Sequence, residues 1–84
     1  MLDDLRKEID KLDEQIVKLL AKRIEIVKKI GDFKKQNNLQ VLDKNRFAKV
    51  LEKVEKTAIQ QGLSPDFVKE LYEVIHKYSC EVEK

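Results

Sequence analysis

The chain has 84 residues, of which 42% are hydrophobic and 40% are charged, with a formal net charge of +2. This length indicates one small domain spanning residues 1–84, close to the lower limit for a self-sufficient core. The small net charge, with basic and acidic residues interleaved, excludes an ordinary nucleic-acid-binding protein. No apolar run is long enough for a signal or membrane-spanning segment, so we expect no membrane partner. The single cysteine excludes an internal disulfide and favours a reducing, cytoplasmic location.

The sequence predicts an all-α fold with three helices, at about residues 2–37, 44–61 and 65–83, and very little loop. In the first helix, residues at alternating steps of three and four form one stripe, which is apolar except for one position. The stripe consists of Leu2, Leu5, Ile9, Leu12, Ile16, Leu19, Arg23, Ile26, Ile30 and Phe33. The Asn37-Asn38 pair then interrupts the pattern and predicts the end of the helix.

Local capping signals delimit the other two helices. Asp43 is a suitable N-cap for the second helix, and Gly62 is placed to end it. Ser64 followed by Pro65 predicts the start of the third helix. The side chains expected to face inward are Phe47, Val50, Leu51, Val54 and Ala58 in the second helix and Phe67, Val68, Leu71, Tyr72, Ile75, Tyr78 and Val82 in the third.

The length of the first helix has a consequence for assembly. A helix of about 36 residues is about 54 Å long, whereas a compact globule of this size is roughly 30 Å across. The helix therefore extends beyond any core that the other two helices could form with it. Because its apolar stripe continues along this extension, the sequence predicts a homodimer.

Arg23 occupies a position in the stripe where leucine or isoleucine is expected. A buried guanidinium needs an anionic partner, because an unpaired buried charge is costly. One interpretation is an ion pair with an acid such as Asp13 or Glu25 of a neighbouring chain. The other is a pocket for an anionic ligand.

Lys34 favours the second interpretation. It follows Arg23 by eleven residues, which places the two side chains within about 20° of each other around the helix. Val27 and Ile30 lie between them. Two cations that flank an apolar floor would suit a small dianion, although a solvated lysine at a helix end would also fit.

Several segments at fixed spacing carry a resemblance to a known family. They are LRKEIDKLDEQIVKLLAKR at 5–23, GDFK at 31–34, DKNR at 43–46, and Ser79 and Glu83 on the last helix. Together they resemble the all-helical chorismate mutases over essentially the whole chain. The resemblance implies an intertwined homodimer in which two long first helices run side by side. It also implies an isomerase of the shikimate pathway, leading to aromatic amino acids, with chorismate as substrate and prephenate as product.

The resemblance further implies that arginines bind the substrate carboxylates. Arg23 matches one such position, and Arg6 matches an arginine that the partner chain contributes. Arg46 would support either the carboxylate end of the substrate or the second helix. Arg6 and Arg23 are seventeen residues, or about 25 Å, apart on one helix. One small ligand could not reach both within a single chain, so a shared ligand would require Arg6 from the partner.

The remaining roles follow from the same resemblance. Lys34 and Glu83, with Arg23, would form the catalytic set, since Lys34 and Glu83 match groups at the ether oxygen of the breaking bond. Asp43 would orient the ring hydroxyl and Ser79 would contact a carboxylate. Asp43 could equally serve only as a helix cap, and Ser79 could be an ordinary helix serine.

This chemistry requires little from the protein. The reaction is an intramolecular pericyclic rearrangement, so we expect no cofactor, no metal and no nucleophile. The sequence has neither the Cys/His spacing of a metal site nor a catalytic triad. A fixed cation or donor at the ether oxygen would stabilise the charge that develops in the transition state.

Two positions depart from the family pattern. Glu83 stands where glutamine is common, and it could donate a hydrogen bond only when protonated. Burial would favour its protonated form and Lys34 nearby would favour its ionised form, so the sequence leaves the balance open. Phe47 stands where a glutamate usually contacts the ring hydroxyl.

Other functions therefore stay open. An apolar residue at the position of Phe47 is also found in isochorismate-pyruvate lyases, which resemble the same fold. A non-catalytic helical regulatory domain could keep Arg23 without turnover. A plain coiled-coil dimerisation domain would be stabilised by Arg23→Leu. His76 is expected to be a partly exposed residue without a special role.

Overall fold

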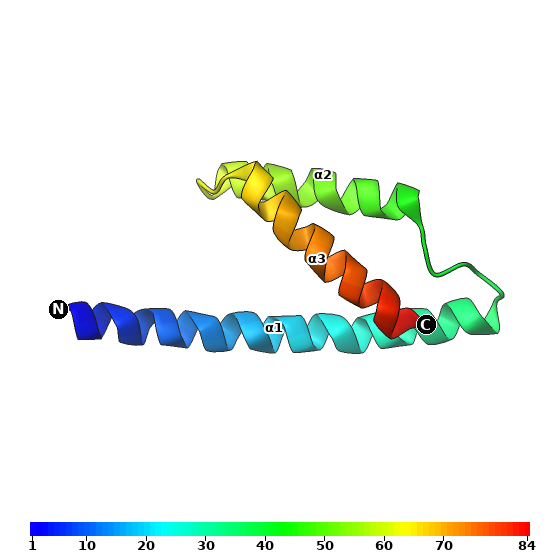
Figure 1. Cartoon of the computed structure of the whole chain (residues 1–84), viewed down its shortest axis with the longest axis horizontal. Helices are drawn as coiled ribbons and strands as arrows, with labels where there is room; N and C mark the ends of the chain where they lie inside the picture. The colour runs from blue at the N-terminus through cyan, green and yellow to red at the C-terminus, as the bar shows by residue number, and fades with distance from the viewer.

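The computed structural model describes residues 1–84 and contains three helices, α1 (Leu2–Gln36), α2 (Lys44–Gln60) and α3 (Pro65–Glu83), and no strand (Figure 1). The all-α prediction is confirmed. The first two helices each end one residue earlier than predicted, because Asn37 and Gln61 have left helical geometry, with ψ angles of 10° and 5°. At the C-terminal ends of α1 and α2, the backbone N–H groups that follow the last helical residue still donate hydrogen bonds to carbonyls of the helix.

The predicted capping residues delimit α2 and α3. The Asp43 side chain accepts a hydrogen bond of 3.0 Å from the backbone N–H of Arg46, and the Ser64 hydroxyl accepts one of 3.3 Å from Phe67 N–H. Gly62 adopts a φ of +75°, which glycine tolerates best and which commonly ends a helix. Short-range signals therefore set the ends of α2 and the start of α3.

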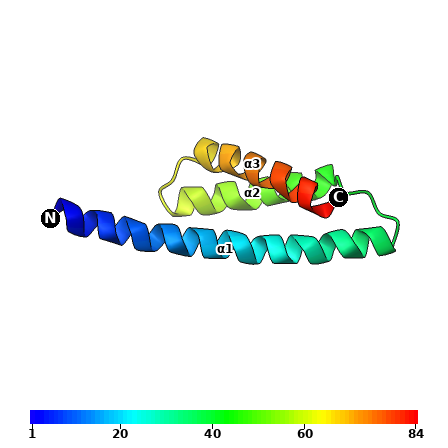
Figure 2. The same cartoon turned by 60° about the horizontal axis from the view of Figure 1, so that its bottom comes forward.

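The helices form an open arrangement in which α3 connects the other two. α3 packs against both α1 and α2, whereas the backbones of α1 and α2 stay apart (Figures 1 and 2). The molecule measures 55 × 23 × 16 Å and has a radius of gyration of 15.7 Å. A compact chain of this length would have a radius near 12 Å. The N-terminal part of α1 extends beyond the other two helices, as its length predicted (Figures 1 and 2).

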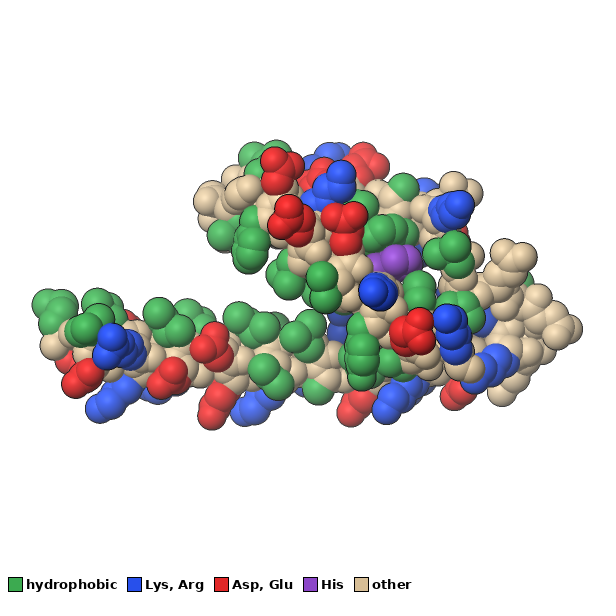
Figure 3. Space-filling view, viewed as in Figure 1, with side chains coloured by type: hydrophobic (Ala, Val, Ile, Leu, Met, Phe, Trp, Pro, Cys, Tyr) green, Lys and Arg blue, Asp and Glu red, His purple; other side chains and the backbone are tan.

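Few side chains are buried in the single chain. Only 6 of the 84 residues are buried, namely Val27, Gly31, Ala58, Val68, Ser79 and Glu83. The apolar stripe of α1 is largely exposed. Figure 3 shows hydrophobic side chains along the upper edge of α1, on the same side as α2 and α3. The single chain therefore lacks a core of ordinary size.

Part of the predicted inward face of α3 is also uncovered. Phe67, Leu71 and Tyr78 are 56%, 45% and 60% exposed, so their predicted burial is wrong within one chain. They lie on a side of α3 that neither α1 nor α2 covers. No helix of the chain is both long enough and apolar enough to cross a membrane.

Candidate functional site

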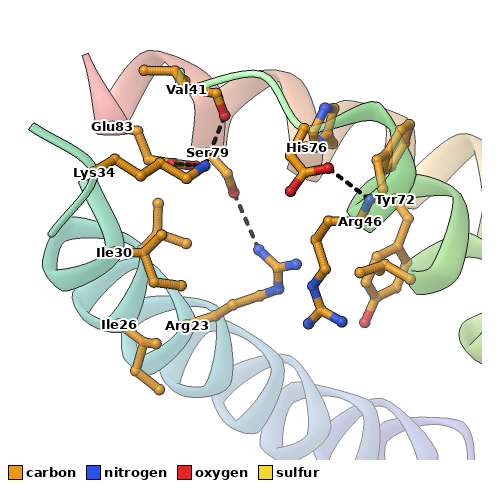
Figure 4. Close-up of a pocket in the computed structure, with 14 residues that line it drawn as sticks. Arg23, Ile26, Ile30, Lys34, Val41, Arg46, Tyr72, His76, Ser79 and Glu83 are labelled. Atoms are coloured by element: carbon orange, nitrogen blue, oxygen red, sulfur yellow. Dashed lines mark hydrogen bonds and ion pairs between the residues drawn. The ribbon is translucent and has the colours of Figure 1, made fainter. Parts of the chain in front are cut away.

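One cavity of about 260 Å³ lies among the three helices (Figure 4). α1, α2 and α3 all contribute to it, together with the loop between α1 and α2. Six of the seven residues that the sequence singled out line this cavity. They are Arg23, Lys34, Asp43, Arg46, Ser79 and Glu83.

Arg23 reaches into the cavity from the middle of α1. Its Nη1 donates a hydrogen bond of 3.1 Å to the hydroxyl of Ser79, which is buried on α3. Its guanidinium carbon lies 5.9 Å from the centre of the Tyr72 ring, a distance suited to a cation–π contact. No carboxylate of the chain lies within ion-pair distance of Arg23. An ion pair with Asp13 or Glu25 of a neighbouring chain stays a prediction.

Arg46 adds a second guanidinium from the first turn of α2. In Figure 4 the side chains of Arg23 and Arg46 point toward the same part of the cavity. Arg46 also makes no ion pair within the chain. Two positive groups without anionic partners therefore line the cavity, an arrangement that favours an anionic ligand.

Lys34 and Glu83 form a close ion pair at one end of the cavity. Lys34 Nζ lies 2.6 Å from Glu83 Oε1, and the two side chains are 17% and 10% exposed. Lys34 also donates a hydrogen bond of 2.7 Å to the backbone carbonyl of Val41 in the loop between α1 and α2. Glu83 Oε1 is buried and has no partner other than the lysine. The ammonium is thus held from two sides, and the carboxyl is held from one.

Asp43 and Arg6 differ from the other predicted residues. Asp43 lines the cavity and caps α2, so the structure is compatible with both roles considered for it. Arg6 lies outside the cavity on the extended part of α1, where it is 67% exposed and 3.9 Å from Asp3. Within one chain it cannot contact a ligand bound near Arg23.

The sequence did not identify a stacked pair at the cavity wall. The rings of Phe47 and His76 lie 3.8 Å apart, centre to centre, and are inclined by only 9°. His76 Nε2 lies 3.5 Å from the thiol of Cys80. His76 is partly exposed, as expected, and it also lines the cavity. The sequence spacing signals only the contact with Cys80, one turn further along α3, because Phe47 and His76 lie on different helices.

Cys80 is not placed to act as a nucleophile. Burial, and secondly the negative charge of Glu83, raise the pKa of the Cys80 thiol, while Lys34 opposes this with a smaller effect. The thiol therefore stays protonated at neutral pH. No cluster of three or more His, Cys, Asp or Glu side chains could hold a metal ion. The cavity offers positive charge and hydrogen-bond donors.

Comparison with known proteins places this geometry in a family. A family model described as chorismate mutase type II matches residues 5–84. The T-protein of Haemophilus influenzae is 36% identical over 70 residues, covering 83% of this chain and 19% of that protein. A 4-amino-4-deoxychorismate mutase of Streptomyces pristinaespiralis is 28% identical over 98% of this chain and 64% of that protein. The chain thus spans less than two thirds of these two relatives.

A solved structure matches over almost the full length. It is a conserved hypothetical protein from Pyrococcus furiosus with 40% sequence identity and a TM-score of 0.80, covering 99% of this chain and 95% of that one. The structural match extends over all three helices, and the family match covers every residue that lines the cavity. The chain belongs to the chorismate mutase type II family.

Proposed function

We propose that this chain is a chorismate mutase, an isomerase that rearranges chorismate to prephenate without a cofactor or metal. The observation that carries the proposal is the unpaired guanidinium of Arg23, which is half-buried in a cavity that it shares with Arg46. A dicarboxylate would supply the missing negative charge. Bidentate ion pairs between arginine and carboxylate would also fix the orientation of the ligand.

The residues support a mechanism based on conformational restraint. Chorismate rearranges only from a compact conformer in which the two carbons that form the new bond lie close together. Arg23, Arg46 and Ser79 would hold the carboxylates so that this conformer is selected. Asp43 would accept a hydrogen bond from the ring hydroxyl. No group of the protein needs to form a covalent bond with the substrate.

Charge stabilisation would come from the pair at the other end of the cavity. As the ether bond breaks, negative charge gathers on its oxygen. Lys34 would donate to that oxygen, and a protonated Glu83 would donate beside it. Because this charge is larger in the transition state than in the substrate, such donors raise kcat more than they lower KM.

A second candidate function has one observation in its favour. Phe47 presents an apolar ring at the cavity wall where a carboxylate would be expected to bind the ring hydroxyl. An isochorismate-pyruvate lyase would have this feature. Incubation of the purified protein with chorismate and with isochorismate separates the two functions, because the mutase forms prephenate and the lyase forms salicylate and pyruvate. Binding of chorismate without loss of its absorbance would instead indicate a regulatory domain.

We also propose that the enzyme is an intertwined homodimer in which the partner's Arg6 completes each cavity. Leu5, Ile9, Leu12 and Ile16 of α1 are each about half exposed, which supports burial against a second chain. The cavity of one chain is slightly smaller than the roughly 300–1,000 Å³ typical of ligand sites, as expected if a second chain adds a wall. We also propose that the chain forms one domain. Its single cysteine supports a cytoplasmic location.

Mixing two inactive variants tests this shared site. We expect Arg6→Ala and Arg23→Ala each to be inactive alone, and an equal mixture, unfolded and refolded together, to regain about a quarter of wild-type activity. Half of the dimers would then be mixed, and each mixed dimer would contain one intact site. The measurement is the rate of chorismate loss after refolding. A mixture that stays inactive would rule out a site built from both chains.

The substitution Glu83→Gln tests the role of Glu83. An ionised carboxylate cannot donate a hydrogen bond and repels negative charge, whereas the amide of glutamine donates. We therefore expect the kcat of Glu83→Gln for chorismate, measured as the rate of chorismate loss, to exceed that of the wild type. An unchanged kcat would remove Glu83 from the ether-oxygen site.

A further inference from the structure

Gly31 lies at the point where the last turn of α3 rests on α1. It is buried, and a Cβ atom built on it would lie 2.9 Å from the Cα, 3.1 Å from the carbonyl oxygen and 3.3 Å from the Cβ of Glu83. Carbon atoms in contact normally stay about 3.5–4.0 Å apart. The two nearest of these atoms belong to the backbone, so no rotamer change of Glu83 could relieve the clash. Any larger residue must push the end of α3 away from α1.

Gly31 is also one helical turn before Lys34, the ion-pair partner of Glu83. The ammonium of Lys34 cannot simply follow a displaced carboxyl, because the carbonyl of Val41 holds it at 2.7 Å. The separation of α1 and α3 at Gly31 therefore sets the distance between ammonium and carboxyl.

Resting on the mutase function proposed above, we infer that Gly31 is a positioning residue that holds the Glu83 carboxyl beside the Lys34 ammonium at the reacting end of the cavity. Gly31 touches no ligand itself. Because Gly31 has no side chain, the backbone of α3 approaches α1 closely enough for the Glu83 carboxyl and the Lys34 ammonium to meet at the same end of the cavity. In Gly31→Ala, α3 must move by at least about 0.6 Å at this point.

The first test compares Gly31→Ala with Gly62→Ala, which replaces the other glycine of the chain. A Cβ on Gly62 meets nothing within 4 Å, but its φ of +75° strains any other residue. Gly62→Ala should therefore lower the denaturation midpoint and leave kcat unchanged. Gly31→Ala should lower kcat for chorismate by about 10²-fold and change KM by less than about threefold. An unchanged kcat in Gly31→Ala would overturn the inference.

The second test separates positioning from packing. Glu83→Ala removes the carboxyl but keeps the Cα, Cβ and carbonyl oxygen that Gly31 meets. In this background Gly31→Ala introduces the same clash, yet should change kcat by less than about twofold, because no carboxyl remains to be displaced. An equal loss of kcat in both backgrounds would mean that Gly31 serves only packing, and would overturn the inference.

Glu83→Asp provides an independent check if Gly31→Ala does not fold. It leaves the contact with Gly31 intact and withdraws the carboxyl by one methylene group. We expect a clear loss of kcat in a variant that circular dichroism shows to be folded. Full activity in Glu83→Asp would show that the position of the carboxyl does not matter, and would overturn the inference.

A stability measurement keeps the inference independent of the proposed reaction. In urea unfolding, the variants Lys34→Ala and Glu83→Ala, with their double variant, give the coupling between the two side chains. The coupling should be present when residue 31 is glycine and absent when it is alanine. If Gly31→Ala is unfolded, the coupling of Lys34 to the side chain at position 83 is measured in Glu83→Asp instead, and it should be clearly weaker than the coupling between Lys34 and Glu83. If the wild type does not convert chorismate, the proposed function fails, and this coupling alone decides the role of Gly31. Equal coupling with and without the added methyl group would overturn it.

Discussion

Replacing Arg23 by alanine is expected to lower kcat/KM for chorismate by at least about 10³-fold. Its guanidinium is oriented by Ser79 and by the Tyr72 ring, and no carboxylate of the chain competes for it. Loss of one member of a desolvated ion pair costs about 2–5 kcal/mol. A bidentate pair is expected in the upper part of this range, and a 10³-fold loss corresponds to about 4 kcal/mol. The measurement is steady-state loss of chorismate absorbance, with circular dichroism to verify that the variant is folded.

Two further substitutions make the Arg23 result specific. Lys22→Ala removes the neighbouring cation, which is exposed on α1, and should leave kcat/KM within about twofold of the wild type. Arg23→Lys keeps the charge but loses the bidentate geometry, so we expect an intermediate loss of about 10²-fold. If Arg23→Leu were fully active and more stable than the wild type, Arg23 would be a residue of a dimerisation helix, and the proposed site would be wrong.

Lys34→Ala is expected to lower kcat by about 10²–10³-fold with a smaller effect on KM, as is typical when a donor to a developing negative charge is removed. The substitution also leaves the buried carboxyl of Glu83 without its only partner. We therefore expect a loss of stability of about 3 kcal/mol, because a buried ion pair loses one of its two members. Single-turnover kinetics and urea unfolding measure the two effects separately.

The double variant Lys34→Ala/Glu83→Ala distinguishes catalysis from stability. Removal of both charges should restore much of the lost stability, because no unpaired charge remains buried, but kcat should stay low. Lys35→Ala is the matched control, since this neighbour is exposed and makes no ion pair. Recovery of kcat together with stability in the double variant would contradict a direct role for Lys34 at the ether oxygen.

The helices could be predicted from the sequence almost to the residue because the signals that end them are local. Asp43, Gly62 and Ser64 each act on backbone groups within three or four positions, so no tertiary information is needed. Burial was harder to predict. Phe67, Leu71 and Tyr78 have the right spacing for a core, but spacing does not reveal whether another helix of the same chain covers them.

The candidate site also combines features that the sequence predicts with features that it does not. The shared direction of Arg23 and Lys34 follows from the helix period, and the structure places both in one cavity. The contact of Arg23 with Ser79 and the stacking of Phe47 on His76 join different helices. Such contacts depend on the register between helices, which the periodicity of a single helix does not specify. The close approach at Gly31 was missed for this reason, because it depends on where α3 ends along α1.

The separation of the α1 and α2 backbones has a consequence for how the site can change. These two helices carry the arginines of the cavity, and α3, which packs on both, helps to determine how far apart they stand. α3 thus acts as a spacer, and substitutions where it meets its neighbours widen or narrow the gap without altering any group that faces the ligand. Val68, which is buried on α3, is one such position. A family built on this plan can adjust the size of molecule it accepts through residues remote from the reacting atoms.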